Sequence, residues 1–217
     1  MQSKNILLGV SLLAIMALIA TVAFFQLEHS SQKSNPPVNA ANMLEREGAP
    51  TKGSINSKVT IVEFFDPACE TCAIFYPLIN NLIRQYPEKI KVVMRYAPFH
   101  KGSDQVARLL EAAHLQGQFW PAVEILFANQ QQWTRHHVAY PERAVELLTS
   151  LPLDHEQFVR DVNSDKITSI IQQDITDGKL LQVRATPQFF VNDKPLVKFG
   201  HKPLLRLVQD TVDEAYQ

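Results

Sequence analysis

Hydrophobic and polar positions change their period along the chain, and the changes mark the expected strands and helices. VTIVEFF, residues 59–65, is a short, nearly continuous apolar run rich in β-branched and aromatic residues. Such a run is typical of a strand covered on both faces. CETCAIFYPLINNLIRQY, residues 69–86, repeats its apolar positions at helical spacing, and KIKVVMRY, residues 89–96, is a second strand pattern. This strand–helix–strand order predicts that the two strands pair in parallel.

A long helical block follows over about residues 101–182. Its first helix is expected to begin near Ser103, which can cap it, and to stop at Gly117. FWPAVEILFANQQQW, residues 119–133, predicts one further helix, and three more helical patterns complete the block.

The chain returns to strand patterns after this block. QFFV, residues 188–191, and PLVKF, residues 195–199, flank a turn at Asn192 and Asp193, which predicts a β-hairpin before a final amphipathic helix. The order predicts an α/β, thioredoxin-like fold, with the helical block inserted between a βαβ unit and a C-terminal ββα unit.

The N-terminus carries ILLGVSLLAIMALIATVAFF, residues 6–25, a run without charged residues. At about 1.5 Å per residue, a helix of this length spans a hydrocarbon core of ~30 Å. Lys4 precedes the run, so the positive-inside rule places the remainder of the chain outside the cytoplasm. The run is longer than a usual signal-peptide core, and we expect an uncleaved anchor, with a cleaved signal peptide as the alternative. We divide the chain into a tail and anchor (1–27), a polar linker (28–50) and a domain (51–217).

Composition narrows the classes of partner and compartment. Lys and Arg number 21 against 22 Asp and Glu, a formal net charge of −1, so we expect no nucleic-acid partner. Apolar residues make up 46% of the chain, enough for a core that needs no disulfide staples. A short tail with one lysine suits a bacterial inner membrane, with the domain in the periplasm, where disulfides persist.

Cys69 and Cys72 are the two cysteines of the chain, and their spacing allows a staple, half a metal site or a redox pair. A staple over three residues closes too small a loop to stabilise a fold. A metal needs three or four ligands, and neither the scattered histidines nor the pair at His136 and His137 supplies them, so we expect no metal. At the start of a helix, Cys69 gains thiolate character, and Cys72 lies one turn on to resolve a mixed disulfide. Such a pair accepts and donates electrons itself, by changing between disulfide and dithiol, so we expect no further cofactor.

Other residues fit the redox interpretation. Glu63, in the predicted strand, would be buried beneath the pair, where a raised pKa suits it to shuttle a proton for Cys72; the alternative is a solvent-facing strand-end residue. Thr186 and Pro187 precede the later strand, and a cis bond there would turn the loop toward the cysteines and offer backbone groups to a substrate strand. His100 either approaches this face or is an ordinary loop histidine.

These segments together resemble the DsbA-like thiol–disulfide oxidoreductases of the thioredoxin superfamily. The resemblance runs from about Gly48 to the C-terminus, through VTIVEFFDPACETC, FYP, KVVMRYAPF, SDQVARLLEAA and RATPQFFVNDKPL. It implies Cys69 as nucleophile, Cys72 as resolving thiol and Pro187 as the cis-proline, and the buried acid of the family falls on Glu63.

The sequence departs from the best-known oxidases of this family between the cysteines. Those proteins carry Pro-His there, whereas this chain has Glu70 and Thr71. An anion beside Cys69 opposes the thiolate, so these two residues are expected to tune the pair toward a weaker oxidant.

The predicted function is therefore a periplasmic thiol–disulfide oxidoreductase, anchored through residues 6–25. Its expected partners are cysteine-containing substrate proteins and a membrane protein that reoxidises the pair. A dithiol oxidase is the first interpretation, and a reductase or isomerase-type protein, fed by a membrane electron donor, is the alternative. A third is a non-catalytic anchored peptide-binding module that keeps the thioredoxin fold.

Overall fold

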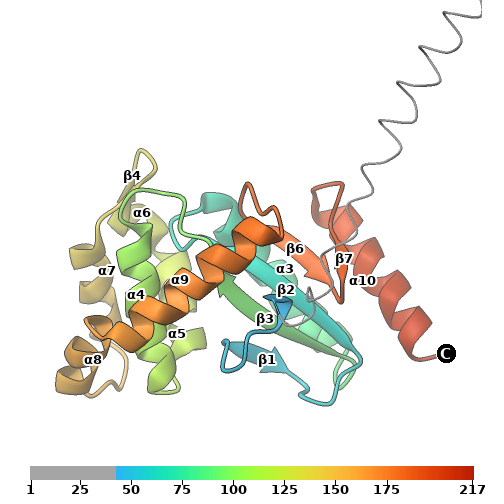
Figure 1. Ribbon diagram of the computed structural model, residues 1–217, viewed down its shortest axis with the longest axis horizontal. Helices are drawn as coiled ribbons and strands as arrows, with labels where there is room; N and C mark the ends of the chain where they lie inside the picture. Colours follow the sequence, from blue (N-terminus) through green and yellow to red (C-terminus); the bar gives the residue numbers. More distant parts are fainter. Residues whose placement is uncertain (1–42) are drawn as a thin grey trace, which may run out of the picture. The chain divides into compact units, whose positions relative to one another are not determined.

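The computed structural model describes residues 43–217, which build a five-stranded sheet flanked by helices (Figure 1). The strand order is β1-β3-β2-β6-β7, and only β2 and β3 are parallel neighbours. The strands are β1 (Thr51–Gly53), β2 (Val59–Phe65), β3 (Ile90–Tyr96), β6 (Gln188–Val191) and β7 (Lys194–Pro195). The parallel pairing predicted for the first two long strands is confirmed. Among residues 43–217, none of the helices has the length and apolar character needed to cross a membrane. The predicted anchor and most of the linker lie outside the described residues.

Helices fall into two groups in Figure 1. Two of them, α3 (Glu70–Gln85) and α10 (His201–Ala215), pack against the sheet. The others form the predicted insertion, which gathers beside the sheet and returns to it through α9. They are α4 (Ser103–Leu115), α5 (Phe119–Ala128), α6 (Gln130–Trp133), α7 (Pro141–Leu148), α8 (His155–Val162) and α9 (Asp165–Leu180), with a small hairpin of β4 (Thr134–Arg135) and β5 (Val138–Ala139). The thioredoxin-like fold with a helical insertion is confirmed.

The central strand β2 is buried on both faces, as its apolar run predicts. Ile61 and Phe65 belong to the larger core beneath α3 and α10. Val62 and Phe64 belong to a smaller cluster on the other face, which Leu44 covers. Alternation along the strand separates the two sets, so each face of β2 is sealed by a different part of the chain.

The predicted linker extends too far into the domain. Residues 43–50 pack against the sheet, with Leu44 and Ala49 buried in the smaller cluster and Arg46 paired with Asp174. Directly after them, β1 adds to the edge of β3 in antiparallel pairing. These partners lie far away along the chain, so local polarity gives no sign of them.

The insertion differs from its prediction in two places. The single helix expected over residues 119–133 is two helices separated at Asn129, and Trp133, the last residue of the second helix, is fully buried. His136 and His137, inside the block expected to be helical, form the tight turn of the β4–β5 hairpin, both with positive φ.

The second strand of the C-terminal hairpin is shorter than predicted. β7 holds only Lys194 and Pro195, and the pairing continues through one backbone hydrogen bond, from the Leu196 N–H to the Phe189 carbonyl oxygen at 2.8 Å. The chain then leaves the sheet, so that Val197 is 92% exposed and Phe199 is also exposed. The β-branched Val197 and the aromatic Phe199 therefore lie on the surface, although their residue types favour a strand.

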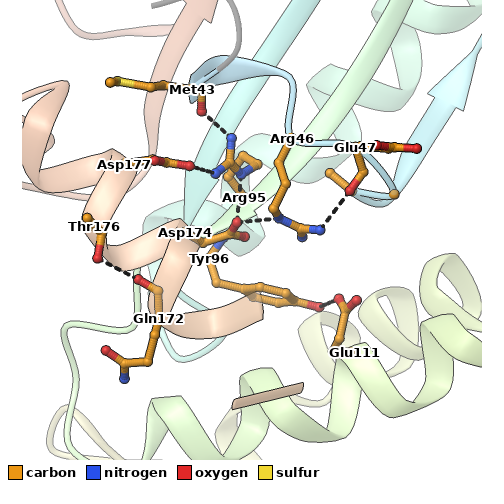
Figure 2. Close-up of polar contacts among 12 residues, drawn as sticks. Met43, Arg46, Glu47, Arg95, Tyr96, Glu111, Gln172, Asp174, Thr176 and Asp177 are labelled. Carbon is orange, nitrogen blue, oxygen red and sulfur yellow. Dashed lines mark hydrogen bonds and ion pairs between the residues drawn. The ribbon is translucent and has the colours of Figure 1, made fainter. Parts of the chain in front are cut away.

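A buried ion-pair cluster of Arg46, Arg95, Asp174 and Asp177 fastens the insertion to the sheet (Figure 2). Arg95 Nε lies 2.8 Å from Asp174 Oδ1, and Arg95 Nη2 lies 2.5 Å from Asp177 Oδ2. Arg46 Nε reaches the same Asp174 oxygen at 2.6 Å, and Arg95 also donates to main-chain carbonyls of the N-terminal segment. The ion-pair cluster thus joins that segment, β3 and α9 at one buried point.

Candidate active site

Cys69 and Cys72 lie where a buried strand gives way to a helix. β2 ends at Phe65, α3 begins at Glu70, and Cys69 takes the N-cap position with extended backbone (φ −77°, ψ 117°). The Cys69 sulfur accepts a hydrogen bond from the Cys72 N–H at 3.4 Å, which is the role that a serine or aspartate oxygen usually has at a helix start. Both side chains are buried free thiols. The capping geometry therefore aims the first N–H groups of α3 at one sulfur.

Hydrogen bonds lower the pKa of Cys69 from its usual 9.0 to about 6. The largest cause is the hydrogen bond with the Cys72 side chain. The Thr186 side chain and the backbone N–H groups of Cys72 and Thr71 act in the same direction. Burial raises the pKa, but the hydrogen bonds outweigh it. Cys69 is mostly thiolate at pH 7 as a result.

Cys72 titrates in the opposite direction. Burial raises its pKa well above 9.0, and the hydrogen bond to Cys69 and the charges of Glu63 and Cys69 add to that effect. The proton of the pair therefore stays on Cys72 while Cys69 carries the negative charge.

Glu63 is buried in β2, and its side chain faces the larger core by alternation with Ile61 and Phe65. The residue is 1% exposed, and its Oε1 has no hydrogen-bond partner among residues 43–217. Burial raises the pKa of Glu63 to about 8, and the charge on Cys69 acts in the same direction. This carboxyl group therefore holds a proton at neutral pH.

The loop before β6 brings Thr186 against the nucleophile from 117 residues away along the chain. The Thr186–Pro187 peptide bond is cis, and the Cys69 sulfur lies 3.3 Å from the Thr186 carbonyl oxygen. β6 pairs with β2 in a register that sets Phe189 opposite Glu63. The structure thus gathers Cys69, Thr186 and the acid-bearing strand at one end of the sheet.

The two residues between the cysteines have different surroundings. Glu70 is exposed in the first turn of α3, whereas Thr71 is half-buried and contributes its backbone N–H to the Cys69 sulfur. Hydrogen bonds therefore lower the pKa of Cys69 without a cationic side chain between the two cysteines.

Residues 45–209 match the sequence model of the family described as Thioredoxin. The chain belongs to the thioredoxin family. A solved thioredoxin-like oxidoreductase from Silicibacter pomeroyi is similar to it, with a TM-score of 0.69 and 26% identity over 80% of this chain and 98% of that one. The resemblance to DsbA-like members of the thioredoxin family is confirmed in sequence and fold.

Two curated relatives of this thioredoxin-family chain differ in length. The probable disulfide bond formation protein D of Bacillus anthracis is 25% identical over 202 residues, covering 88% of this chain and 90% of that protein. The Na⁺/H⁺ antiporter NhaA of Herminiimonas arsenicoxydans is 30% identical over 145 residues, covering 67% of this chain but 22% of the antiporter. The chain spans less than a third of the length of the antiporters that it matches.

One residue of this thioredoxin-family site was missed by the sequence interpretation. Asp66 is fully buried three positions before Cys69, and its carboxylate accepts hydrogen bonds from four residues. His100, left open by the sequence, is one of them: its Nδ1 lies 2.7 Å from Asp66 Oδ2, and its ring stacks on His137. An aspartate directly after a strand and before a turn is the available signal, because this residue type often caps its own turn.

The surroundings of the pair hold a hollow and no metal cluster. Within residues 43–217, no group of three or more His, Cys, Asp and Glu side chains could hold a metal ion. A hollow of about 600 Å³ opens beside Glu70 between α3 and α6, with Ile74, Phe127 and Gln131 among its lining residues. The hollow thus adjoins the residue that follows Cys69.

Proposed function

We propose that this protein is a thiol–disulfide oxidoreductase that exchanges disulfides with cysteine-containing substrate proteins through Cys69 and Cys72, and that it acts as a dithiol oxidase. The observation that carries the proposal is the opposite titration of the two thiols. The pKa of Cys69 is lowered to about 6, whereas the pKa of Cys72 is raised well above 9.0. One sulfur is therefore a nucleophile and a good leaving group, and the other is a protonated reserve.

Oxidation of a substrate starts from the disulfide form of the pair. A substrate thiolate attacks the Cys69 sulfur, so a mixed disulfide forms and the Cys72 sulfur leaves. The second substrate thiolate attacks the substrate sulfur of that mixed disulfide and releases Cys69 as a thiolate. The substrate loses two electrons and two protons, and the pair gains both electrons. Cys72 keeps one proton, and the other reaches solvent because Cys69 stays ionised.

Glu63 is the proposed proton carrier for Cys72. Its carboxyl group is buried, protonated at neutral pH and electrostatically coupled to both sulfurs. It can deliver a proton as the Cys72 sulfur leaves and take it back when the pair is reoxidised. No further cofactor enters this scheme, because the cysteine pair carries the electrons.

Thr186 and Pro187 form the proposed substrate contact. The Thr186 carbonyl oxygen lies 3.3 Å from the Cys69 sulfur, so it offers an acceptor beside the reacting atom. An extended substrate segment can pair with this loop as an added strand, and its cysteine then meets Cys69.

The oxidase direction is supported by the same low pKa. A stabilised thiolate favours the dithiol form of the pair, so electrons flow more readily from a substrate to the protein. We place the domain in the periplasm of a bacterium, tethered through residues 6–25 near a membrane partner that reoxidises it. A soluble periplasmic form after signal cleavage has the same chemistry, and a reductase fed by a membrane donor runs it in reverse.

The redox state of the pair in living cells tests this proposal. Acid quenching, thiol alkylation with a mass-shifting reagent and non-reducing electrophoresis give the fraction of Cys69 and Cys72 in the disulfide. We expect mostly disulfide, whereas mostly dithiol indicates the reductase or isomerase-type alternative. Full biological activity of a Cys69→Ala, Cys72→Ala double variant would instead support the peptide-binding module.

A further inference from the structure

We propose that Asp66 is a positioning residue for the redox pair, which fixes the turn from residue 66 to 69 and fastens it to the start of the helical insertion. Asp66 does not touch a substrate in this proposal. It acts through the N–H groups that surround the Cys69 sulfur. The inference rests on the proposed function of the pair and assigns a further residue to it.

The main chain of Asp66 makes hydrogen bonds with both cysteines. Its carbonyl oxygen accepts from the Cys69 N–H at 3.0 Å. A hydrogen bond from the Asp66 backbone also acts on Cys72, in the direction that lowers the pKa of that thiol. A small rotation at Asp66 therefore changes the position of one cysteine and the surroundings of the other.

The carboxylate holds this backbone in place with its two oxygens. Oδ1 accepts from the Ala68 N–H at 2.8 Å and from the Ser103 hydroxyl. Oδ2 accepts from the Phe99 N–H at 2.6 Å and from His100 through its N–H at 2.8 Å and its Nδ1 at 2.7 Å. Asp66 itself is 0% exposed, so these partners replace water completely.

The partners come from two parts of the fold. Ala68 belongs to the turn that ends at Cys69, whereas the other three residues belong to the loop after β3 and the first position of α4. One side chain thus connects the redox turn to the point where the insertion begins. The N–H groups of Thr71 and Cys72 reach the Cys69 sulfur only while this turn keeps its shape.

The chemistry of the contacts calls for a carboxylate. Both oxygens accept from backbone N–H groups, so an asparagine in this position must place its NH₂ group against one of them. The hydroxyl of Ser103 can rotate to accept from that NH₂ group. The hydrogen bond that is lost is then the one from the Ala68 N–H. Asp66→Asn therefore loosens the turn while the contacts to Phe99 and His100 persist.

The test is the thiolate absorbance titration of Cys69 in the reduced Asp66→Asn protein. We expect the pKa of Cys69 to rise by about one unit, which is a tenfold loss of thiolate stabilisation, with a matching fall in oxidising strength against glutathione. Ser103→Ala removes a single donor and should shift the pKa less, in the same direction.

Asp174→Asn is the matched control, because Asp174 is an equally buried and paired aspartate in the ion-pair cluster. It should lower the melting temperature and leave the Cys69 titration unchanged. Equal melting losses in both variants, with an unchanged Cys69 pKa in Asp66→Asn, would overturn the inference. If Asp66→Asn fails to fold, the His100→Ala, Ser103→Ala double variant keeps the backbone contacts and should still raise the pKa; an unchanged pKa there overturns the inference.

The outcome is separable from that of the proposed function. An unmodified protein without disulfide exchange activity contradicts the proposed function, whatever Asp66 does. An active protein whose Asp66→Asn form keeps its Cys69 pKa contradicts only the role of Asp66.

Discussion

Two buried polar clusters lie on opposite faces of the same pair of strands. They differ in whether their charged groups are paired. In the ion-pair cluster, Arg95 from β3 meets Asp174 and Asp177 at 2.8 and 2.5 Å. In the redox site, Glu63 from β2 has an oxygen without a partner among the described residues, and its pKa is raised to about 8. One cluster holds compensated charges, and the other holds an uncompensated acid beside a thiolate.

The register of the two strands causes this separation. Glu63 lies opposite Met94, and Arg95 is the next residue along β3. Because side chains alternate between faces, the guanidinium points away from the carboxyl group. A paired buried charge contributes to the structure, whereas an unpaired one keeps a proton available for chemistry.

The largest expected effect comes from removing the nucleophile of the redox site. Cys69→Ser should lower disulfide exchange with a protein substrate such as insulin by on the order of 10³-fold or more, because no thiolate remains to form the mixed disulfide. Its melting temperature should change little. Cys72→Ser is the partner experiment and should accumulate mixed disulfides on non-reducing gels; retained turnover by Cys69→Ser would contradict the nucleophile assignment.

The second effect breaks the ion-pair cluster instead. Arg95→Met should cost about 3–5 kcal/mol of unfolding free energy, because it leaves Asp177 without its partner and Asp174 with one cation fewer. Urea unfolding measures the loss, and the folded fraction should keep its Cys69 titration. Arg160→Met, which removes an exposed ion pair with Glu156, is the control and should leave the midpoint nearly unchanged. A normal midpoint in Arg95→Met would show that the cluster does not hold the fold.

The third effect depends on pH. The pKa of Glu63 is raised from 4.5 to about 8 in the folded protein, so the folded state holds this proton more tightly than the unfolded chain does. The stability linked to it is present below pH 4.5 and is lost as the pH rises through about 8. The free energy of unfolding of Glu63→Gln should therefore rise relative to that of the natural protein by a few kcal/mol between pH 4.5 and about 8. Above pH 8 the difference between the two proteins should stay constant.

Glu63→Gln should also lose activity while it gains stability. Without a proton carrier, attack by Cys72 on the mixed disulfide that Cys69 forms with the reoxidising partner should slow on the order of 10²-fold. Rapid-quench kinetics measure this step separately from the first attack by Cys69. Parallel stability curves in the two proteins from pH 4.5 to 8 would mean that Glu63 is not an uncompensated acid.

The smallest effect concerns the exposed Glu70. Glu70→His should lower the pKa of Cys69 by about half a unit, because a cation replaces an anion at a solvent-screened position. Glu70→Gln removes the charge without adding a cation and separates the two contributions. Identical thiolate titrations in all three proteins would show that hydrogen bonds alone set the acidity of Cys69.

Local patterns carry the parts of the site that the sequence predicts. The spacing of Cys69 and Cys72, the acid within an apolar strand and the Thr-Pro before a later strand are all visible within a few residues. The burial of Glu63 follows from VTIVEFF, because every neighbour in that run is apolar or β-branched. The helix-capping place of Cys69 follows from the same junction.

Distant partners account for what the sequence does not predict. Arg46 binds an aspartate 128 residues away, and three of the four partners of Asp66 lie 33 to 37 residues further on. The polar composition around Arg46 therefore predicts a linker, because the sequence shows nothing of its distant partner. The exposed Val197 is the converse, since this strand-like residue lies on the surface directly after Leu196, whose N–H still donates to β6.

Thr186 follows Cys69 by 117 positions, and this separation delays the completion of the site while the chain is made. At about 5–20 residues per second, a ribosome needs roughly 6 to 23 seconds to reach Thr186 after it has added Cys69. Until then the nucleophile has neither its cis-proline loop nor the neighbouring strand β6. The surroundings of the nucleophile are therefore complete only when synthesis is nearly finished.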